Sequence, residues 1–173
     1  DFNKTVLRID ISHNNLDDEA GVLIAEALRH NTTITSLDMA HNLVRAATGE
    51  KLASMLKRNK TLVSLDVGHN HMGPILYWKN KYEKVQTAGA GHLLGAALRV
   101  NKTLTEFDAS HNEFGPAAGD AFGESMRRNR TITTLNLSNN CIAKAGAKRL
   151  AYALQSRNRL TALDLSNNLL GAE

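Results

Sequence analysis

The chain has 173 residues, of which 21 are Lys or Arg and 17 are Asp or Glu, so its net charge is only +4. The single cysteine, Cys141, excludes an internal disulfide and with it a disulfide-stabilised secreted scaffold. Aromatic residues make up 5%, so any core must be aliphatic. No apolar run reaches the roughly 18 residues that a membrane span needs.

One pattern recurs six times along the chain, namely L-x-x-L-x-L-x-x-N with other apolar residues in place of some leucines. Its copies begin at residues 6, 34, 62, 104, 132 and 160, a period of 28 that one interval of 42 interrupts. The alternation within each copy predicts a short strand. Behind the first five copies, small or apolar residues recur at i, i+3 and i+7, which predicts an amphipathic helix. Gly49, Leu52 and Leu56 are one such set, and Ala147, Leu150 and Leu154 form the last.

A strand and a helix in every unit predict a solenoid, in which parallel strands line the concave face and helices the convex face. We expect an α/β fold with a single domain, residues 1–173. Its units are expected at 5–32, 33–60, 61–102 with an insertion at 75–88, 103–130, 131–158 and, in part, 159–173. We also expect a fragment of a longer chain, because neither end carries the polar cap that a solenoid needs.

These units resemble the leucine-rich repeat of the ribonuclease-inhibitor-like subtype, whose repeats are about 28 residues long. The resemblance covers the chain except the insertion and implies a curved solenoid that binds proteins. It leaves the activity open, because the family includes inhibitors, GTPase-activating proteins, immune sensors, actin regulators and ciliary scaffolds.

Residues on either side of the central apolar residue of each strand are expected to point to the concave face. The residues that follow it form a column that we call the Asp column: Asp10, Asp38, Asp66, Asp108, Asn136 and Asp164. The residues that precede it and that we include in a predicted protein-binding face are Arg8, Ser36, Ser64, Glu106 and Thr134. An acidic column suits a basic partner. The alternative is that each Asp hydrogen-bonds within its own turn.

Two further columns lie in the turns after the strands. The turn asparagines, which we expect to hydrogen-bond the backbone of neighbouring turns, are Asn14, Asn42, Asn70, Asn112, Asn140 and Asn168. The His column is His13, His41, His69 and His111, and Asn139 and Asn167 continue it. We interpret it as a turn position that accepts both residue types, with a pH-sensitive surface as the alternative. A metal site is not favoured, because the imidazoles are spread over four turns.

The loops before the strands contain asparagines in N-x-T, here called the loop asparagines: Asn3, Asn31, Asn59, Asn101 and Asn129. Their regular phase predicts that they close helices in the left-handed conformation. Secretion and glycosylation are the alternative.

Basic residues gather in the same loops: Arg29, Lys57, Arg58, Lys60, Arg99, Lys102, Arg127, Arg128, Arg130, Arg157 and Arg159. Their proximity to helix C-termini explains most of them. The alternative is a basic rim that meets an acidic protein or, less favoured, nucleic acid. No aromatic residues are interleaved with them, so specific single-strand binding is not supported.

The insertion at residues 75–88 reads ILYWKNKYEKVQTA and holds the only Trp of the chain. Tyr and Trp are enriched in binding hot spots, and insertions in repeats often map to the binding face. The sequence therefore predicts a contact loop, with these residues against a partner: Tyr77, Trp78, Lys79, Lys81 and Tyr82. A tolerated surface loop is the alternative.

We find no nucleophile with a base and an orienting group, no phosphate-binding glycine loop and no zinc spacing. We therefore expect no enzyme activity, cofactor, metal or small-molecule substrate, and no membrane partner. The predicted function is a protein-binding scaffold in a larger intracellular assembly of the cytoplasm or cytoskeleton. Its resemblance to ciliary repeat proteins suggests a cilium or flagellum. The alternatives are a GTPase-activating protein of the Ran-activator type and the repeat array of an immune-type receptor.

Overall fold

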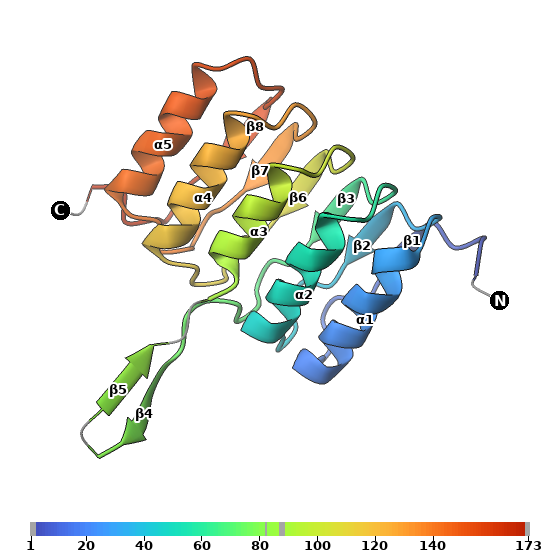
Figure 1. Ribbon diagram of the computed structural model, residues 1–173, viewed down its shortest axis with the longest axis horizontal. Coiled ribbons are helices and arrows are strands. Elements are labelled where there is room, and N and C mark those ends of the chain that lie inside the picture. Colours follow the sequence, from blue (N-terminus) through green and yellow to red (C-terminus); the bar gives the residue numbers. More distant parts are fainter. Residues whose placement is uncertain (1–2, 82, 87–88, 172–173) are drawn as a thin grey trace.

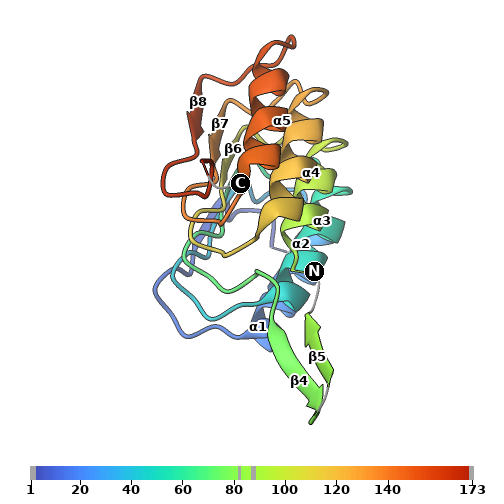
Figure 2. The same cartoon turned by 90° about the vertical axis from the view of Figure 1, so that its left-hand side faces the viewer.

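The computed structural model describes residues 3–81, 83–86 and 89–171. Six short strands form one parallel sheet in chain order: β1 (Arg8–Asp10), β2 (Ser36–Asp38), β3 (Ser64–Asp66), β6 (Glu106–Asp108), β7 (Thr134–Asn136) and β8 (Ala162–Asp164). Five helices alternate with them: α1 (Asp18–His30), α2 (Ala46–Leu56), α3 (Gly91–Leu98), α4 (Pro116–Met126) and α5 (Lys144–Leu154). The helices lie side by side across one face of the sheet (Figure 1), and Figure 2 shows the two layers from the side. The predicted solenoid is confirmed.

All the strands pair in the same register, so equivalent positions of successive units are neighbours. Asp38, for example, lies between Asp10 and Asp66. The central residue of each inner strand is buried, as at Leu65, while the residues beside it are half-buried or exposed. This alternation places the Asp column on the face of the sheet opposite the helices.

Local signals set the helix ends. The carboxylate of Asp17 caps α1 by accepting from Ala20 N at 3.1 Å, and Asp18 and Glu19 occupy its first turn, where they interact favourably with the helix dipole. Helix α4 begins with Pro116 directly after a glycine in the left-handed region. Proline is favoured there because the first turn needs no N–H donor from it.

The core lies between the sheet and the helices and is mainly aliphatic, as predicted, but it also contains Phe107, Phe114 and Phe122. A fully buried Leu contributes about 1.5–3 kcal/mol, so repetition of Leu in every unit adds a similar increment each time. One predicted core position differs: Leu154 is 54% exposed, because no further helix of the described chain covers the outer side of α5. None of the described helices is long and apolar enough to cross a membrane.

The insertion forms a hairpin and not the predicted loop. Strands β4 (Leu76–Asn80) and β5 (Glu83–Gln86) pair antiparallel and project from the solenoid between β3 and α3 (Figures 1 and 2). Gly73 and Gly89 make this exit compact: a Cβ on Gly89 would overlap the backbone of Gly73, and one on Gly73 would overlap the carbonyl of Glu113. The chain therefore leaves and re-enters the repeat at nearly the same point.

The hairpin carries the residues that we predicted as a contact. Lys81 is exposed. Tyr82 lies outside the described residues, and so do the side chains of Tyr77, Trp78 and Lys79.

Candidate functional site

The turn after each strand is stabilised by the turn asparagines. The side-chain amide of Asn112 donates to the carbonyl of Val67 in the preceding unit and to that of Ser110 in its own turn, both at 2.9 Å. Its Oδ1 accepts from Met72 N at 3.3 Å. From Asn42 onward each turn asparagine also bonds the unit before it. Four of them are buried, where water cannot replace these bonds, so the predicted structural role is confirmed.

The loop asparagines stabilise the opposite edge, where helices end and strands begin. Asn59 Oδ1 accepts from Thr61 N and Leu62 N at 2.9 and 2.8 Å, and its Nδ2 donates to Leu28 O at 2.7 Å, in the last turn of α1. Asn101 and Asn129 make the equivalent bonds to α2 and α3. Each one thus caps the helix of the preceding unit.

Two predictions about these asparagines change. The left-handed conformation was wrong: Asn31 has φ −72° and ψ 137°, and no loop asparagine is among the left-handed residues that the structure describes. Their side chains satisfy the loop through hydrogen bonds to N–H groups two and three residues ahead, so the backbone need not reverse. Asn59, Asn101 and Asn129 are buried with the amide nitrogen occupied, which gives glycosylation there no support.

Left-handed backbone occurs instead in the turns after the strands. The members of the His column have φ between 51° and 54°, and Asn139 and Asn167 have 55° and 54°. Asn and His tolerate this region better than most residues. The same backbone geometry therefore accommodates the four His and the two Asn of the column.

The four imidazoles stack on one another along the edge of the concave face. Successive ring centroids are 4.1, 4.0 and 3.8 Å apart, with interplanar angles of 12°, 13° and 16°. Burial and then the neighbouring His111 and His41 lower the pKa of His69, because a charged ring is unfavourable there. Protonation of His69 is thus less favourable than protonation of a free imidazole.

Each member of the Asp column accepts a backbone hydrogen bond through one side-chain oxygen, and the second oxygen of Asp108 also has a partner. In every unit Oδ1 accepts the N–H of the residue two positions ahead, at 2.8–3.0 Å. Hydrogen bonding within the turn is therefore confirmed. Asn136 forms the same bond with an amide in place of a carboxylate, and its Nδ2 donates to Asp108 Oδ2 at 2.7 Å. No ion pair that the structure describes involves Asp38, Asp66 or Asp108.

The middle of the column differs electrostatically from its ends. Burial raises the pKa of Asp66 to about 6, the N–H of Gly68 opposes the rise, and the charges of Asp108 and Asp38 add to it. At one end, the hydroxyl and then the N–H of Ser12 lower the pKa of Asp10. A negative charge at the centre of the column is thus less favourable than a negative charge at its ends.

Both columns line one concave hollow of about 400 Å³. Small residues such as Gly68 and Ser110 lie between the Asp and His positions of each turn and leave the space open. A second hollow, about 460 Å³, extends along the His column to His71 and Glu113. These two residues also line a third, about 410 Å³, at the base of the hairpin.

The structure thus joins the concave columns to the hairpin, which the sequence indicated as two separate candidate sites. His71, Glu113 and the small residues were missed as part of this surface. The small residues were detectable, since they recur with the 28-residue period two positions after the Asp column. Neither His71 nor Glu113 belongs to a column that we had identified. Within the described residues, no group of three or more His, Cys, Asp or Glu is arranged to hold a metal ion.

Comparisons with known proteins agree with this architecture. A family model described as a leucine-rich repeat matches residues 2–25, 30–53, 58–75 and 128–151, together just over half of the chain. A search of curated protein sequences finds no match.

The solved structures that are similar in fold include the following two. One is described as Leiomodin-1 Actin-Binding Site 2, with a TM-score of 0.68 and 20% identity over 88% of this chain and 81% of that one. The other is the tropomodulin C-terminal domain of Caenorhabditis elegans, with a TM-score of 0.66 and 16% identity over 88% of this chain and 84% of that one. The repeated sequence, the family match and the strand–helix units together show that this chain belongs to the leucine-rich repeat family.

Proposed function

We propose that this chain is a non-catalytic scaffold whose concave strand face binds an extended basic segment of a partner protein. One observation carries the proposal: Asp38, Asp66 and Asp108 are adjacent carboxylates in the concave hollow, and none takes part in a described ion pair. Like charges on neighbouring strands repel, and a Lys or Arg side chain that enters the hollow relieves that repulsion.

The hollow suits a chain that runs across the strands. It extends from Ser12 in the first unit to Ser138 in the fifth. Strands about 4.8 Å apart place five units over about 19 Å, which an extended peptide covers with about six residues. A short segment of about this length that carries several Lys or Arg residues therefore spans the Asp column, and the long side chains can reach the individual carboxylates.

The hairpin provides a second contact in this proposal. Its base shares His71 and Glu113 with the hollow along the His column, so a partner seated on the concave face can reach β4 and β5 without crossing other elements. Of the predicted contact residues, Tyr77, Trp78 and Lys79 lie in β4, Lys81 directly follows it, and Tyr82 lies outside the described residues. Aromatic residues of this kind are frequent hot spots.

We further propose that the solenoid is one domain of a longer subunit in a cytoskeletal assembly. The fold similarity to a leiomodin actin-binding site supports a cytoskeletal partner. A ciliary setting is the narrower form of this proposal and comes from the sequence resemblance alone. Co-sedimentation with actin filaments and with microtubules separates the two filament systems.

A cross-linked pull-down with mass spectrometry tests the proposal on four proteins. These are the wild type, Asp38→Asn with Asp66→Asn, the matched control Glu19→Gln with Glu50→Gln, and a form in which Pro74 is joined to Gly89. Asn keeps the backbone acceptor, as Asn136 does. Glu19 and Glu50 are exposed carboxylates on the helices. The deletion restores the 28-residue period.

We expect the Asn variant to lose its main partner, the control to keep it, and cross-links in the wild type to join the concave face to a Lys- or Arg-rich segment. Equal recovery with the Asn variant and the control would contradict the proposal. A small GTPase that all four forms retain, and whose GTP hydrolysis they accelerate, would replace it with the activator alternative.

A further inference from the structure

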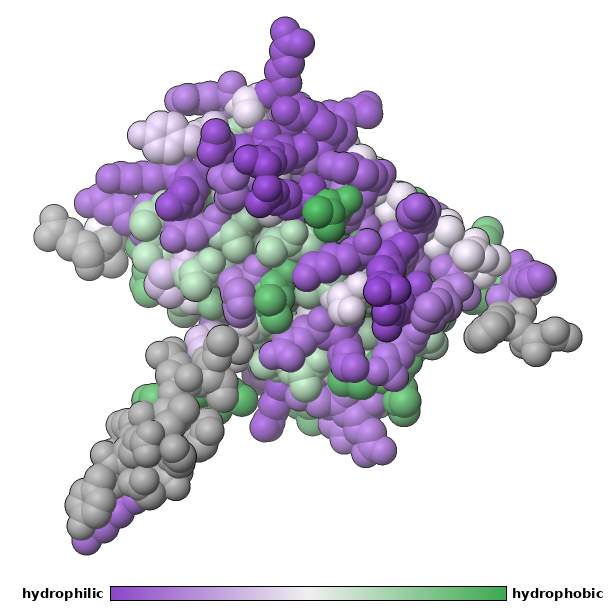
Figure 3. All heavy atoms as spheres, in the orientation of Figure 1, coloured by the Kyte–Doolittle hydropathy of each residue, from purple (hydrophilic) through white to green (hydrophobic). Residues whose placement is uncertain are grey.

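The edge where helices end carries a positive charge that the proposed concave site does not use. We call it the basic rim, the eleven Lys and Arg residues of loops 29–33, 57–61, 99–103, 127–131 and 155–159. These loops hold no Asp or Glu, so all 17 acidic residues and the other ten basic ones lie elsewhere. The rim is thus strongly positive on a chain whose net charge is +4. In Figure 3 hydrophilic side chains cover the upper edge of the molecule, where α4 and α5 end.

Helix capping explains only a small part of the rim. Lys102 donates to Arg99 O at 3.4 Å, and Arg130 donates to Arg127 O at 3.2 Å. Carbonyls of the last turns of α1, α2 and α3 already accept from the loop asparagines. The cations are therefore not needed to satisfy these helix ends.

Most of the rim has no internal partner among the described residues. The ion pairs there join Glu124 to Arg127 at 3.1 Å and to Arg128 at 3.6 Å. The remaining side chains form no described hydrogen bond or ion pair: Arg29, Lys57, Arg58, Lys60, Arg99, Arg157 and Arg159. Ten of the eleven rim residues are exposed, and the half-buried Arg29 has a buried Nε without a partner.

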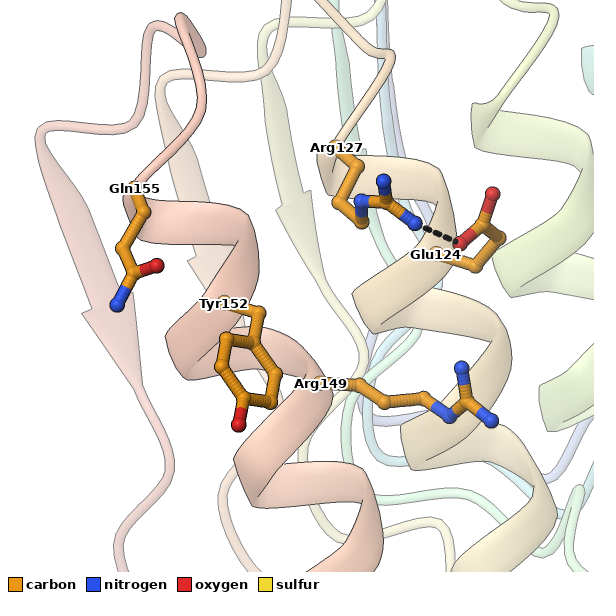
Figure 4. Close-up of a pocket in the computed structure, with 5 residues that line it drawn as sticks. All are labelled: Glu124, Arg127, Arg149, Tyr152 and Gln155. Atoms are coloured by element: carbon orange, nitrogen blue, oxygen red, sulfur yellow. Dashed lines mark hydrogen bonds and ion pairs between the residues drawn. The ribbon is translucent and has the colours of Figure 1, made fainter.

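The rim borders a groove between α4 and α5, with a volume of about 290 Å³. Figure 4 shows Arg127 and Glu124 projecting from α4, and Arg149, Tyr152 and Gln155 from α5. Tyr152 is 63% exposed. Tyr is among the residues that most often dominate binding energy, so this groove offers an aromatic anchor that the rest of the rim lacks, while its Arg149 is paired with Asp120 at 2.8 Å.

We infer that the basic rim, with the α4–α5 groove at its end, binds an extended acidic segment of a second partner protein. The positive strip is only one loop wide. Glu106 and the Asp column lie on its strand side, and Glu26, Asp120 and Glu124 lie on its helix side. A nucleic-acid duplex is negative over its whole width and would face these carboxylates, whereas a single acidic chain fits between them.

The spacing of the rim also fits a peptide. Equivalent residues of adjacent units are separated by about 4.8 Å at the strands and about 8–10 Å at the helices. An extended peptide rises about 3.3 Å per residue, so acidic residues at every second or third position meet successive units.

Fluorescence anisotropy tests this inference with a labelled peptide of about twelve alternating Glu and Ser residues, long enough to follow five units. The variants are Arg58→Glu with Arg99→Glu on the rim, and Lys144→Glu with Lys148→Glu as a control of equal charge at exposed positions of α5. Circular dichroism checks the fold, and Arg58→Ala with Arg99→Ala serves if charge reversal impairs folding. A DNA duplex is the competing probe.

We expect the peptide to bind the wild type with an affinity that falls as salt increases. The rim variant is expected to lose about tenfold, which corresponds to about 1.4 kcal/mol, and the control to lose less than about twofold. Equal losses in both variants would show attraction by net charge alone and overturn the inference. Tighter binding of the duplex, lost in the rim variant, would also overturn it.

Discussion

Both edges of the solenoid are stabilised by buried asparagines. The two edges differ in which of their other repeated polar residues also bond the backbone. Buried asparagines bond neighbouring units at both edges. Where the strands end, the Asp and His columns also serve the backbone, through the Oδ1 bonds and the left-handed turns. Where the helices end, the loop asparagines satisfy the backbone, and only Lys102 and Arg130 of the basic rim contact it.

This difference shows how a repeated residue in a solenoid should be interpreted. Repetition alone marks either a structural position or a binding position. Hydrogen bonds to the backbone distinguish these two roles. They explain the turn asparagines fully and one side-chain oxygen of each member of the Asp column, but they explain little of the basic rim. The unused groups carry opposite charges, so we expect the two surfaces to bind different partners.

The largest effect should follow from removing a turn asparagine in the interior. Asn112→Ala leaves the N–H of Met72 without a partner in a buried turn and removes one of two hydrogen bonds from each of the carbonyls of Val67 and Ser110. An unsatisfied buried group costs about 1–3 kcal/mol and each lost hydrogen bond about 1 kcal/mol, so we expect a loss of about 3 kcal/mol in the free energy of unfolding. Urea denaturation measures it. In Asn14→Ala water replaces the lost bonds, because Asn14 is exposed, and the loss should stay below about 1 kcal/mol. Similar losses in the two variants would contradict the difference that we expect between buried and exposed turn asparagines.

A smaller effect should separate backbone geometry from ring stacking in the His column. His69→Ala places Ala at φ 52°, and we expect it to lower the free energy of unfolding by about 1–2 kcal/mol. His69→Asn should change it by less than about 0.5 kcal/mol, because Asn139 occupies the equivalent turn at φ 55°. Thermal unfolding of both variants measures the two changes in stability. If His69→Asn is as destabilising as His69→Ala, the stacked rings, and not the turn, determine this position.

The smallest effect should have the opposite sign. Asp66→Asn removes a half-buried charge whose pKa is raised to about 6, while its amide can still accept from Gly68 N. Such a rise in pKa corresponds to about 3 kcal/mol for a fully buried group, and solvent screening of this half-buried side chain reduces it to about 1 kcal/mol. We therefore expect the variant to be more stable than the wild type at pH 7.

The pH dependence of that gain follows from the direction of the shift. The folded protein takes up a proton at Asp66 at higher pH than the unfolded chain does, so the cost of the charge begins to fall below about pH 6 and is gone only below the ordinary Asp pKa of 3.8. The gain from Asp66→Asn should fall to about half by pH 5 and approach zero below about pH 4. His69 acts in the other direction, since its lowered pKa means that acid protonates the unfolded chain first. Both proteins share that effect, so it cancels in the comparison. A gain that stays constant with pH would contradict the assignment.

Features that recur in every unit were predictable from the sequence, whereas the feature that occurs only once was not. The strands, the helices and the turn asparagines follow from positions that recur up to six times, so a few departures from the pattern do not hide them. The hairpin has no second copy for comparison. Its apolar and aromatic residues around a polar turn were compatible with either a loop or strands. The loop asparagines were ambiguous for a different reason, because Asn suits both a left-handed cap and a side-chain hydrogen bond to the next N–H groups.

The candidate site was predictable in position but not in its energetics. The Asp column follows from the period, whereas the raised pKa of Asp66 depends on burial and on neighbours at 28 and 42 residues' distance in sequence. The joining of the His column to the hairpin base through His71 and Glu113 depends on how the turns stack. Neither property belongs to a single repeat.

The most direct test of the central claim measures stability and binding in one variant. Isothermal titration of a peptide of alternating Lys and Ser into the wild type and Asp66→Asn at pH 7 gives the affinities, and urea unfolding of the same samples gives the stabilities. We predict that Asp66→Asn is more stable by about 1 kcal/mol and binds the peptide about threefold to tenfold more weakly, because the charge that costs stability is the charge that binds the partner. A variant that gains stability and keeps its full affinity would contradict the claim, since the Asp column would then serve only its own turns.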